Sequence, residues 1–274
     1  MRAAQPRRVL VIKLGALGDF VQAMGPAAAI RAHHPRAEII LLTTAPFAAL
    51  GRAAPYFDHV WIDERTSLAY WGALWRFRRR LREARFDRVY DLQTSDRSSL
   101  YFGLMRPGPR PEWSGIARGA SHPHANPRRD LMHTLDRQAE QLAACGIVRV
   151  PPPDLSWAMT DLARFALPEL LLLLIPGSAA HRPEKRWPIE RFAELARLAA
   201  ARGVAPVVLG GPAEAPLGAT ITAVTPLGMD LTGRTSFGDL VALGARASHA
   251  VGNDTGPMHL VVAGGAPATV LYSR

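Results

Sequence analysis

The chain repeats one pattern along its length: a short apolar run, a turn that contains glycine, and a segment whose apolar residues recur at helical spacing. The first instance is RVLVIK at 8–13, followed by LGALG at 14–18 and by helical spacing from Phe20 to Arg31. Strands that alternate with helices are joined by crossover connections, so they pair in parallel and helices cover both faces of the sheet. The predicted fold class is therefore α/β, with Rossmann-like domains.

A run of prolines interrupts this pattern. In VPPPD at 150–154, three prolines fix φ and remove three donors, so neither a helix nor a central strand can continue through the segment. We expect two domains, at 1–150 and 151–274, whose parallel sheets face a central cleft. Further strands are expected at 37–42, 59–63, 88–93, 170–175, 205–209, 249–252 and 268–272. Further helices are expected at about 67–85, at 131–144 with Leu131, Leu135 and Leu142 on one face, at 189–201 and at 237–245.

The positive charge of the chain is concentrated in its first half. Residues 1–150 carry 23 basic and 13 acidic side chains, whereas residues 151–274 carry 10 of each. Such a half attracts an anionic partner, which could be nucleic acid, an acidic membrane or a phosphorylated substrate, or it is simply a solvated basic face. The stretch WGALWRFRRRLREAR at 71–85 has a composition suited to anionic lipid, so peripheral contact with the inner membrane is one hypothesis.

Other features narrow the location and the partners. The longest wholly apolar segment, at 170–176, is far shorter than the roughly 20 residues that span a bilayer. The single cysteine, Cys145, cannot form an internal disulfide and fits a reducing compartment, as a buried structural thiol. The chain has no recognised RNA or DNA motif, so nucleic acid is not expected as a partner. These features predict a cytoplasmic protein.

Parallel α/β sheets bind ligands beyond the carboxyl ends of their strands, where helix amino termini offer N–H groups to anions. Three turns in this chain have that form, and the first runs from Lys13 through Gly15 and Gly18 to Asp19. Its G-x-x-G spacing lacks the middle glycine of the dinucleotide fingerprint, and no carboxylate ends the second strand, so a nicotinamide dehydrogenase is disfavoured. Asp19 is either a helix cap or a carboxylate that accepts a proton from a hydroxyl nucleophile.

The other two turns follow strands of the second half. One is PGS at 176–178, with Lys185 as a nearby cation, and the other is GNDTGPMH at 252–259, which is rich in groups that can donate to a pyrophosphate. The segment GGPAE at 210–214 supplies the carboxylate of Glu214, which could hold a ribose. The alternative interpretations are a solvated loop residue for Lys185, helix caps for Asp254 and Thr255, and a packed core residue for His259.

Several kinds of chemistry are not indicated by the sequence. It has no D-x-D pair and no metal-ligand spacing of His, Cys and carboxylate residues, so neither a metal site nor a cofactor is predicted. It also has no G-x-S-x-G turn, so catalysis by a Ser-His-Asp triad is not supported.

At these turns the chain resembles the glycosyltransferase family of lipopolysaccharide heptosyltransferases. The resemblance covers nearly the whole chain and rests on five blocks in the family's order and spacing. The blocks are IKLGALGD at 12–19, PGSAAHRPEKRWPIERFAEL at 176–195, LGGPAE at 209–214, LTGRTSFGDL at 231–240 and GNDTGPMHL at 252–260. The resemblance implies a GT-B fold that holds the donor mainly in the second domain and the acceptor in the first. It also implies transfer from an ADP-sugar, typically ADP-heptose, with inversion and without a required metal.

The resemblance further implies roles for single residues. Asp19 matches the family's proposed general base, and Lys13, Gly15 and Gly18 lie with it on the acceptor side. Lys185 would stabilise the charge that builds on the departing diphosphate. The other donor-side matches are Asp254, Thr255, Gly256 and His259 at the diphosphate-sugar, Gly177 and Ser178 at the phosphate, Glu214 at the ribose, and Thr235 at the adenine.

Two departures from the family leave the acceptor open. The chain is shorter than usual at its carboxyl end, and QTSDR at 93–97 and SHPH at 121–124 have no close correspondence in the characterised core heptosyltransferases. The first of these segments adds Arg97 to the acceptor side, which fits an anionic glycan or glycolipid. The acceptor and the transferred sugar can therefore differ from those of the family. The alternative is a catalytically weak or inactive protein of the same fold that only binds a nucleotide or a glycan.

Overall fold

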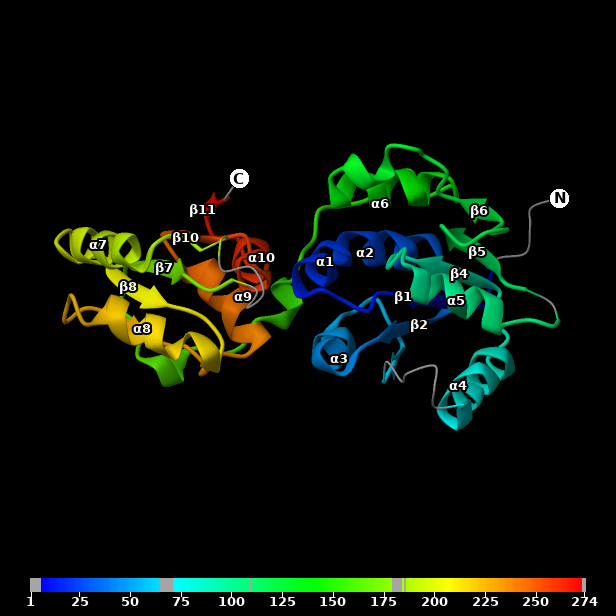
Figure 1. Cartoon of the computed structure of the whole chain (residues 1–274), viewed down its shortest axis with the longest axis horizontal. Coiled ribbons are helices and arrows are strands. Elements are labelled where there is room, and N and C mark those ends of the chain that lie inside the picture. The colour runs from blue at the N-terminus through cyan, green and yellow to red at the C-terminus, as the bar shows by residue number, and fades with distance from the viewer. Residues whose placement is uncertain (1–5, 65–70, 109, 179–183, 185, 273–274) are drawn as a thin grey trace. The chain divides into compact units, whose positions relative to one another are not determined.

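The computed structural model describes residues 6–64, 71–108, 110–178, 184 and 186–272. The chain divides into two compact units, Met1–Pro153 and Asp154–Arg274, each with one parallel sheet (Figure 1). The boundary falls at the end of the proline run. The predicted α/β class with two Rossmann-like parallel sheets is confirmed.

The sheet of the first unit has the strand order β3-β2-β1-β4-β5-β6, and every neighbouring pair is parallel. The order changes direction between β1 and β4, and ligands of such sheets bind beyond the carboxyl ends of the strands at this point. The strands are β1 (Arg8–Ile12), β2 (Glu38–Thr43), β3 (His59–Ile62), β4 (Arg88–Asp91), β5 (Glu112–Gly115) and β6 (His122–Pro123).

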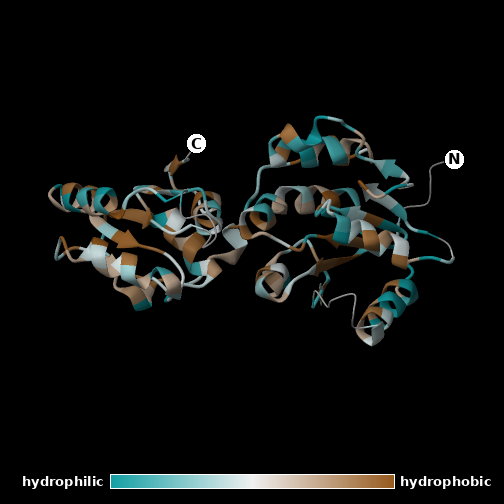
Figure 2. Ribbon diagram, in the orientation of Figure 1, coloured by the Kyte–Doolittle hydropathy of each residue, from teal (hydrophilic) through white to brown (hydrophobic). Residues whose placement is uncertain are grey.

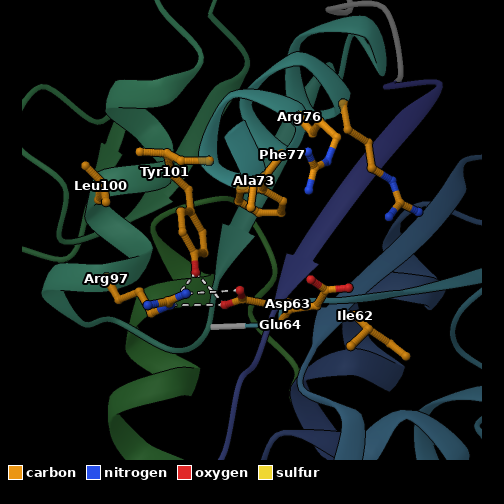
Figure 3. Close-up of a pocket in the computed structure, with 11 residues that line it drawn as sticks. Ile62, Asp63, Glu64, Ala73, Arg76, Phe77, Arg97, Leu100 and Tyr101 are labelled. Atoms are coloured by element: carbon orange, nitrogen blue, oxygen red, sulfur yellow. Dashed lines mark hydrogen bonds and ion pairs between the residues drawn. The ribbon is translucent and has the colours of Figure 1, made fainter. Parts of the chain in front are cut away.

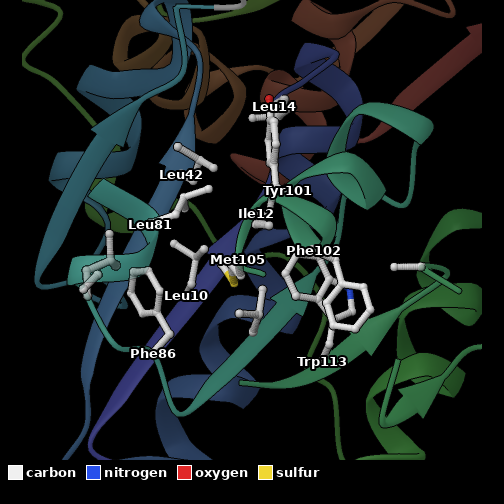
Figure 4. Close-up of a cluster of buried hydrophobic side chains, with 14 residues drawn as sticks. Leu10, Ile12, Leu14, Leu42, Leu81, Phe86, Tyr101, Phe102, Met105 and Trp113 are labelled. Atoms are coloured by element: carbon white, nitrogen blue, oxygen red, sulfur yellow. The ribbon is translucent and has the colours of Figure 1, made fainter. Parts of the chain in front are cut away.

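Helices cover both faces of this sheet, so its central strand β1 is buried from Val9 to Ile12 and reads there as a continuous apolar run. Side chains of β1, β2, β5 and α5 meet in one core cluster, which includes Ile12, Leu42, Phe102 and Trp113 (Figure 4). The helices are α1 (Leu17–Gln22), α2 (Met24–His33), α3 (Ala45–Ala53), α4 (Trp71–Glu83), α5 (Asp96–Leu104), η1 (Arg129–Leu131) and α6 (Thr134–Ala143).

The sheet of the second unit has the order β11-β10-β7-β8-β9, again with parallel neighbours only. Its central strand β7 is wholly buried, and hydropathy colouring shows the strands as the apolar centre of the unit (Figure 2). The strands are β7 (Leu171–Ile175), β8 (Ala205–Val208), β9 (Met229–Asp230), β10 (His249–Asn253) and β11 (Ala268–Leu271). The helices are η2 (Ser156–Ala158), η3 (Ala163–Phe165), α7 (Ile189–Ala200), η5 (Pro212–Glu214), α8 (Ala215–Thr222), α9 (Phe237–Arg246) and α10 (Gly256–Ala263).

One predicted helix begins later than expected. Leu131 lies in the separate turn η1 and is 87% exposed, so the prediction that it shares one helix face with Leu142 was wrong. The helix α6 starts at Thr134 because Met132 and His133 have extended backbones, and His133 Nδ1 accepts the N–H of Leu135 at 3.4 Å. Leu142 is fully buried, as predicted for its part of the helix.

Two glycines let the helices α9 and α10 cross at close range. A Cβ on Gly244 would lie 2.1 Å from the carbonyl oxygen of Val261, and a Cβ on Gly264 would lie 2.1 Å from that of Val241. No side chain fits at either position, so the backbones of the two helices are in direct contact. This contact fixes α10, which begins at Gly256, directly after Asp254 and Thr255.

We expect Gly244→Ala to lower the free energy of unfolding by about 1–3 kcal/mol, because the added methyl group forces the two helices apart. Urea unfolding followed by circular dichroism measures this loss. Gly103→Ala is the control, since Gly103 lies on α5 with no atom within 4 Å of the added carbon. Equal stability of the Gly244→Ala variant and the wild type would contradict the packing argument.

Candidate functional site

The turn after β1 is held by side chains from both neighbouring strands. The N–H of Leu14 donates to Gln93 Oε1 at 2.8 Å, and Thr44 Oγ1 donates to the carbonyl oxygen of Leu14 at 2.9 Å. Gly15 has a φ of +131°, and a Cβ there would lie 2.7 Å from the ring of Phe47, so both conformation and space require glycine. The turn is thereby fixed just before α1.

Asp19 lies in the first turn of α1 and is partly exposed. The N-cap of α1 is Ala16, and no side chain makes a capping hydrogen bond there. Within the described part of the chain, no hydrogen bond or ion pair of the Asp19 carboxylate is recorded, so the structure does not use this group as a cap.

Lys13, which the resemblance places on the acceptor side, has a buried side chain. Its side chain is 3% exposed, and Nζ donates to the carbonyl oxygen of Leu92 at 3.2 Å. Burial lowers the pKa of Lys13, and the nearby charges of Asp19 and Asp91 oppose that shift. Lys13 therefore acts on this site from beneath the turn and does not present its ammonium group at the surface.

A buried carboxylate that sequence reasoning missed lies beside Lys13. Asp91 ends β4 with no exposed surface, and its Oδ1 accepts the N–H groups of Gln93 at 3.1 Å and Thr94 at 2.9 Å. Among the described residues, its Oδ2 has no hydrogen-bond partner. Burial raises the pKa of Asp91 to about 6. An aspartate at the end of an apolar strand, in RVYD, was the available sequence signal.

Arg97 lines a hollow of about 220 Å³ between β3, α4 and α5 (Figure 3). Asp63 lies at its base with 6% exposure and accepts both Nε and Nη2 of Arg97 at 3.1 Å. The hydroxyl of Tyr101 also donates to Asp63, at 2.5 Å. The hydrogen bond to Asp63 raises the pKa of the Arg97 guanidinium above its usual value. Arg97 is thus held rigidly with about one third of its side chain exposed.

Two more arginines of α4 line the same hollow, and sequence reasoning did not single them out. Arg76 is exposed, and Arg80 lies over the ring of Trp61 with its Cζ 3.9 Å from the ring centroid. Glu64 is on the same wall. The hollow therefore combines three guanidinium groups with two carboxylates, at the same edge of the sheet as Asp19.

At the carboxyl edge of the second sheet, one buried amide joins two of the predicted turns. Asn253 has no exposed surface, and its Nδ2 donates to the carbonyl oxygens of Pro176 at 2.8 Å and Gly177 at 3.3 Å. Its Oδ1 accepts the N–H of Trp187 at 3.0 Å. The blocks 176–195 and 252–260 are therefore connected through this side chain, whose linking role sequence reasoning missed.

Glu214 connects a third loop to the same edge. A Cβ on Gly177 would lie 2.9 Å from Cγ of Glu214, so the two residues are in contact. The carboxylate of Glu214 accepts the N–H of Gly211 at 2.8 Å. The N–H of Gly233 donates to the carbonyl oxygen of Gly210 at 2.8 Å, which ties in the loop that contains Thr235. Four loops of the second unit thus meet at one edge.

The Asp254–Gly256 segment leads into α10. Thr255 is the N-cap residue but makes no side-chain cap, and its Oγ1 is buried with no hydrogen-bond partner in the described part of the chain. His259 Nε2 lies 3.7 Å from Asp254 Oδ1, and each side chain is 32% exposed. Gly256 begins the helix and is followed by Pro257, so the first turn presents a free N–H at Gly256.

Ser178 lies on the loop that follows β7. Ser178 Oγ accepts Nε of Arg186 at 3.1 Å. Lys185 lies outside the described residues. Of the donor-side residues predicted from the sequence, the eight that the structure describes are all at the carboxyl edge of the second sheet: Gly177, Ser178, Glu214, Thr235, Asp254, Thr255, Gly256 and His259.

The described ranges contain neither a side-chain cluster suited to a metal ion nor a helix suited to crossing a bilayer. No three His, Cys, Asp or Glu side chains gather there as a possible metal site. No helix in those ranges has the length and apolar character needed to cross a bilayer.

Comparisons with known proteins agree on one family. Residues 74–274 match the model of glycosyltransferase family 9 (heptosyltransferase). The lipopolysaccharide core heptosyltransferase OpsX of Haemophilus influenzae is 25% identical over 292 aligned positions, which cover 98% of this chain and 79% of that protein.

Solved structures are similar in fold. The glycosyl transferase family 9 structure from Veillonella parvula has a TM-score of 0.82 at 23% identity, covering 96% of this chain and 80% of its own. The Escherichia coli heptosyltransferase WaaC with ADP-2-deoxy-2-fluoro heptose has a TM-score of 0.73 at 21% identity, covering 96% and 88%.

Two Rossmann-like units with parallel sheets, each with polar loops at the carboxyl edge, have the architecture of the GT-B fold. The match over 201 of 274 residues is decisive for the family. The chain belongs to glycosyltransferase family 9, the heptosyltransferase family, and the protein is a glycosyltransferase.

The buried carboxyl group of Asp91 leads to a pH prediction. Its pKa is about 6 in the folded protein, against about 3.9 for an unfolded chain, so its contribution to stability is present below pH 4 and is lost as the pH rises through 6. Asp91→Asn cannot ionise. We expect the free energy of unfolding of the wild type, minus that of Asp91→Asn, to fall by roughly 2–3 kcal/mol between pH 4 and 7.

Urea unfolding at a series of pH values measures this difference. Asp130→Asn is the matched control, because the Asp130 side chain is 79% exposed and its difference curve should be nearly flat. Parallel stability curves for the wild type and Asp91→Asn would show that Asp91 does not titrate with a raised pKa.

Proposed function

We propose that the protein transfers a heptose or a related sugar from an ADP-sugar to a lipopolysaccharide-type or other cell-envelope glycan, with inversion and without a metal ion. The observation that carries this proposal is the carboxyl edge of the second sheet in a family 9 chain. There Asn253 joins two loops beside the carboxylate of Glu214 and the hydroxyl of Thr255, which has no hydrogen-bond partner among the described residues.

The second unit holds the donor in this proposal. The diphosphate lies against the first turn of α10 and accepts hydrogen bonds from its N–H groups, from Thr255 and from Ser178. Glu214 accepts from the ribose, and Thr235 contacts the adenine. Asp254 and His259 bind the sugar side of the diphosphate. Support for an ADP-sugar comes from WaaC, which was solved with ADP and with an ADP-heptose analogue.

The first unit holds the acceptor. Asp19 removes the proton from the acceptor hydroxyl as its oxygen forms a bond to the anomeric carbon and the bond to the diphosphate oxygen breaks. The leaving ADP carries the electron pair, and Lys185 and the α10 amide groups stabilise its charge, each donor contributing about 3 kcal/mol at the transition state. Attack opposite the leaving group inverts the anomeric carbon.

The hollow around Arg97 provides a place for an acidic group of the acceptor. Arg97 keeps its bond to Asp63 there, while Arg76 and Arg80 supply positive charge that no recorded carboxylate bond neutralises within the described residues. OpsX is named a lipopolysaccharide core heptosyltransferase, which supports a glycolipid acceptor for this chain. On the acceptor side, Gly15 and Gly18 serve to position Asp19.

The donor assignment is tested by Thr255→Val, which removes the buried hydroxyl but keeps its shape. In the wild type, we expect a panel of ADP-, UDP- and GDP-sugars to give a thermal shift with the ADP-sugars only. Thr255→Val should weaken ADP-sugar binding by roughly tenfold, the effect of about 1.4 kcal/mol for one hydrogen bond to a charged group. Thr220→Val is the control, because Thr220 Oγ1 donates to the carbonyl oxygen of Pro216 on the exposed side of α8.

In the panel of nucleotide-sugars, a thermal shift of the wild type with UDP- or GDP-sugars in place of ADP-sugars would overturn the ADP assignment.

Asp19→Asn tests the base. We expect turnover to fall by about 10²–10⁴-fold while the affinity for the ADP-sugar is unchanged, since the carboxylate acts on the acceptor proton only. Single-turnover transfer and donor titration by calorimetry separate the two effects. Asp136→Asn, an exposed substitution in the first turn of α6, is the control. Full turnover in Asp19→Asn would rule out this base, and an inactive wild type that still binds ADP-sugars would favour a binding protein.

A further inference from the structure

The helix α4 carries two tryptophans on its outer side. Trp71 is 80% exposed and Trp75 is 58% exposed, and their spacing of four residues sets them one above the other on the same face. The opposite side of the helix packs into the first unit through Leu81, which is 1% exposed, and through Phe77, whose ring centroid is 5.0 Å from that of Tyr101. Neighbouring exposed aromatic residues with polar residues around them are typical of an interaction surface.

A groove of about 770 Å³ continues this face at the carboxyl-terminal half of α4. Trp75 lines it together with Arg78, Arg82, Arg85 and Arg110. Arg78 donates to the carbonyl oxygen of Arg106, and Arg82 donates to that of Pro107 at 2.9 Å. These bonds hold the segment after α5 against α4, so the groove is a built feature of the unit.

The carboxylates of the groove all have partners. Glu83 pairs with Arg79 at 2.6 Å, Glu112 pairs with Arg88, and Asp87 accepts the backbone N–H groups that begin β1 at 2.7 and 2.8 Å. By contrast, within the described ranges no carboxylate partner is recorded for four lining arginines. These are Arg78, Arg82, Arg85 and Arg110. The groove lining, with five arginines and three carboxylates, is therefore positive on balance.

The groove is distinct from the hollow around Arg97. Asp87 immediately precedes β4 and Glu112 begins β5, so the groove lies at the amino edge of the first sheet. Asp19 and Arg97 lie at the carboxyl edge. Since α4 runs the length of the strands, it lines the hollow with Arg76 and Arg80 and the groove with the arginines that follow. The groove arginines are thus free of the sugar-transfer role proposed above.

We propose that the outer face of α4 and this groove form a docking surface for a bilayer that contains anionic phospholipid. Charge complementarity selects this occupant, because the four arginines match headgroup phosphates, and the indole rings of Trp71 and Trp75 suit the boundary between headgroups and acyl chains. With α4 flat on the bilayer, the carboxyl edge of the sheet stands to one side of the contact, where a membrane-anchored acceptor reaches it. The docking surface deepens the proposed glycolipid acceptor but does not depend on the donor or on the sugar.

Vesicle sedimentation of the full chain tests the proposal. We expect binding to vesicles of phosphatidylglycerol and phosphatidylcholine, weak binding to pure phosphatidylcholine, and release at 0.5 M salt, because surface charges are then screened. Arg85→Gln with Arg110→Gln should weaken binding by about 25-fold, or roughly fivefold for each arginine near an anionic surface. Neither residue makes a recorded hydrogen bond through its side chain, and circular dichroism and thermal unfolding check that the variant is folded.

The matched control removes the same charge elsewhere on the first unit. Arg36 and Arg52 are exposed with no recorded partner in the described ranges, so Arg36→Gln with Arg52→Gln should leave vesicle binding within about twofold of the wild type. Trp71→Ala with Trp75→Ala should abolish the blue shift of tryptophan fluorescence that vesicles induce. If both double variants lost vesicle binding equally, the binding would depend only on net charge. That result would overturn the proposal.

Two further outcomes would also overturn it. In the first, the groove binds random oligonucleotides more tightly than it binds vesicles. The other is loss of transfer to a water-soluble acceptor in Arg85→Gln with Arg110→Gln, which would make the groove part of the acceptor site. Failure of ADP-sugar binding, by contrast, would overturn the donor proposal and leave vesicle binding unchanged, so the two failures are distinguishable.

Discussion

The side-chain amide of Asn253 organises the carboxyl edge of the second sheet. It satisfies two carbonyl oxygens after β7 and one N–H before α7, all without exposed surface. Removing a group of this kind leaves several buried polar atoms without partners, which costs more than the bonds themselves contribute. Because α10 starts three residues after Asn253 and is locked against α9 by Gly244 and Gly264, the same edge is fixed from both sides.

The first sheet differs, because it has buried ionisable groups beside its site. Lys13 directly follows β1 and Asp91 ends the neighbouring strand β4, and burial lowers the pKa of Lys13 and raises that of Asp91, so that it favours the neutral form of each. A buried charge is tolerated only when other charges or dipoles compensate it, and here Asp19 and Asp91 both act on Lys13. The electrostatic environment of the predicted base is therefore set partly by groups that no substrate touches.

Periodicity and turn chemistry predicted the framework well. Each of the eight strands expected from the sequence lies within two residues of its observed position, because buried strands of parallel sheets are continuous apolar runs. The helices α3, α5 and α8 lie where no helix was expected, since their sequences are short and rich in Ala, Ser, Thr or Gly. Motif spacing brought out residues that lie together at the carboxyl edge of the second sheet, but contacts between distant segments had no local signal. The bond from Arg97 to Asp63 and the link through Asn253 are of this second kind.

The position of α4 between the hollow and the groove limits how its sequence can change in length. Arg76 and Arg80 face one side, Arg78 and Arg82 face the other, and Leu81 enters the core between them. One inserted residue would rotate everything after it by about 100° around the helix axis. Leu81 would leave the core and each set of arginines would move to the wrong side. Substitutions can therefore retune either surface separately, whereas an insertion or deletion in this helix would disrupt both at once.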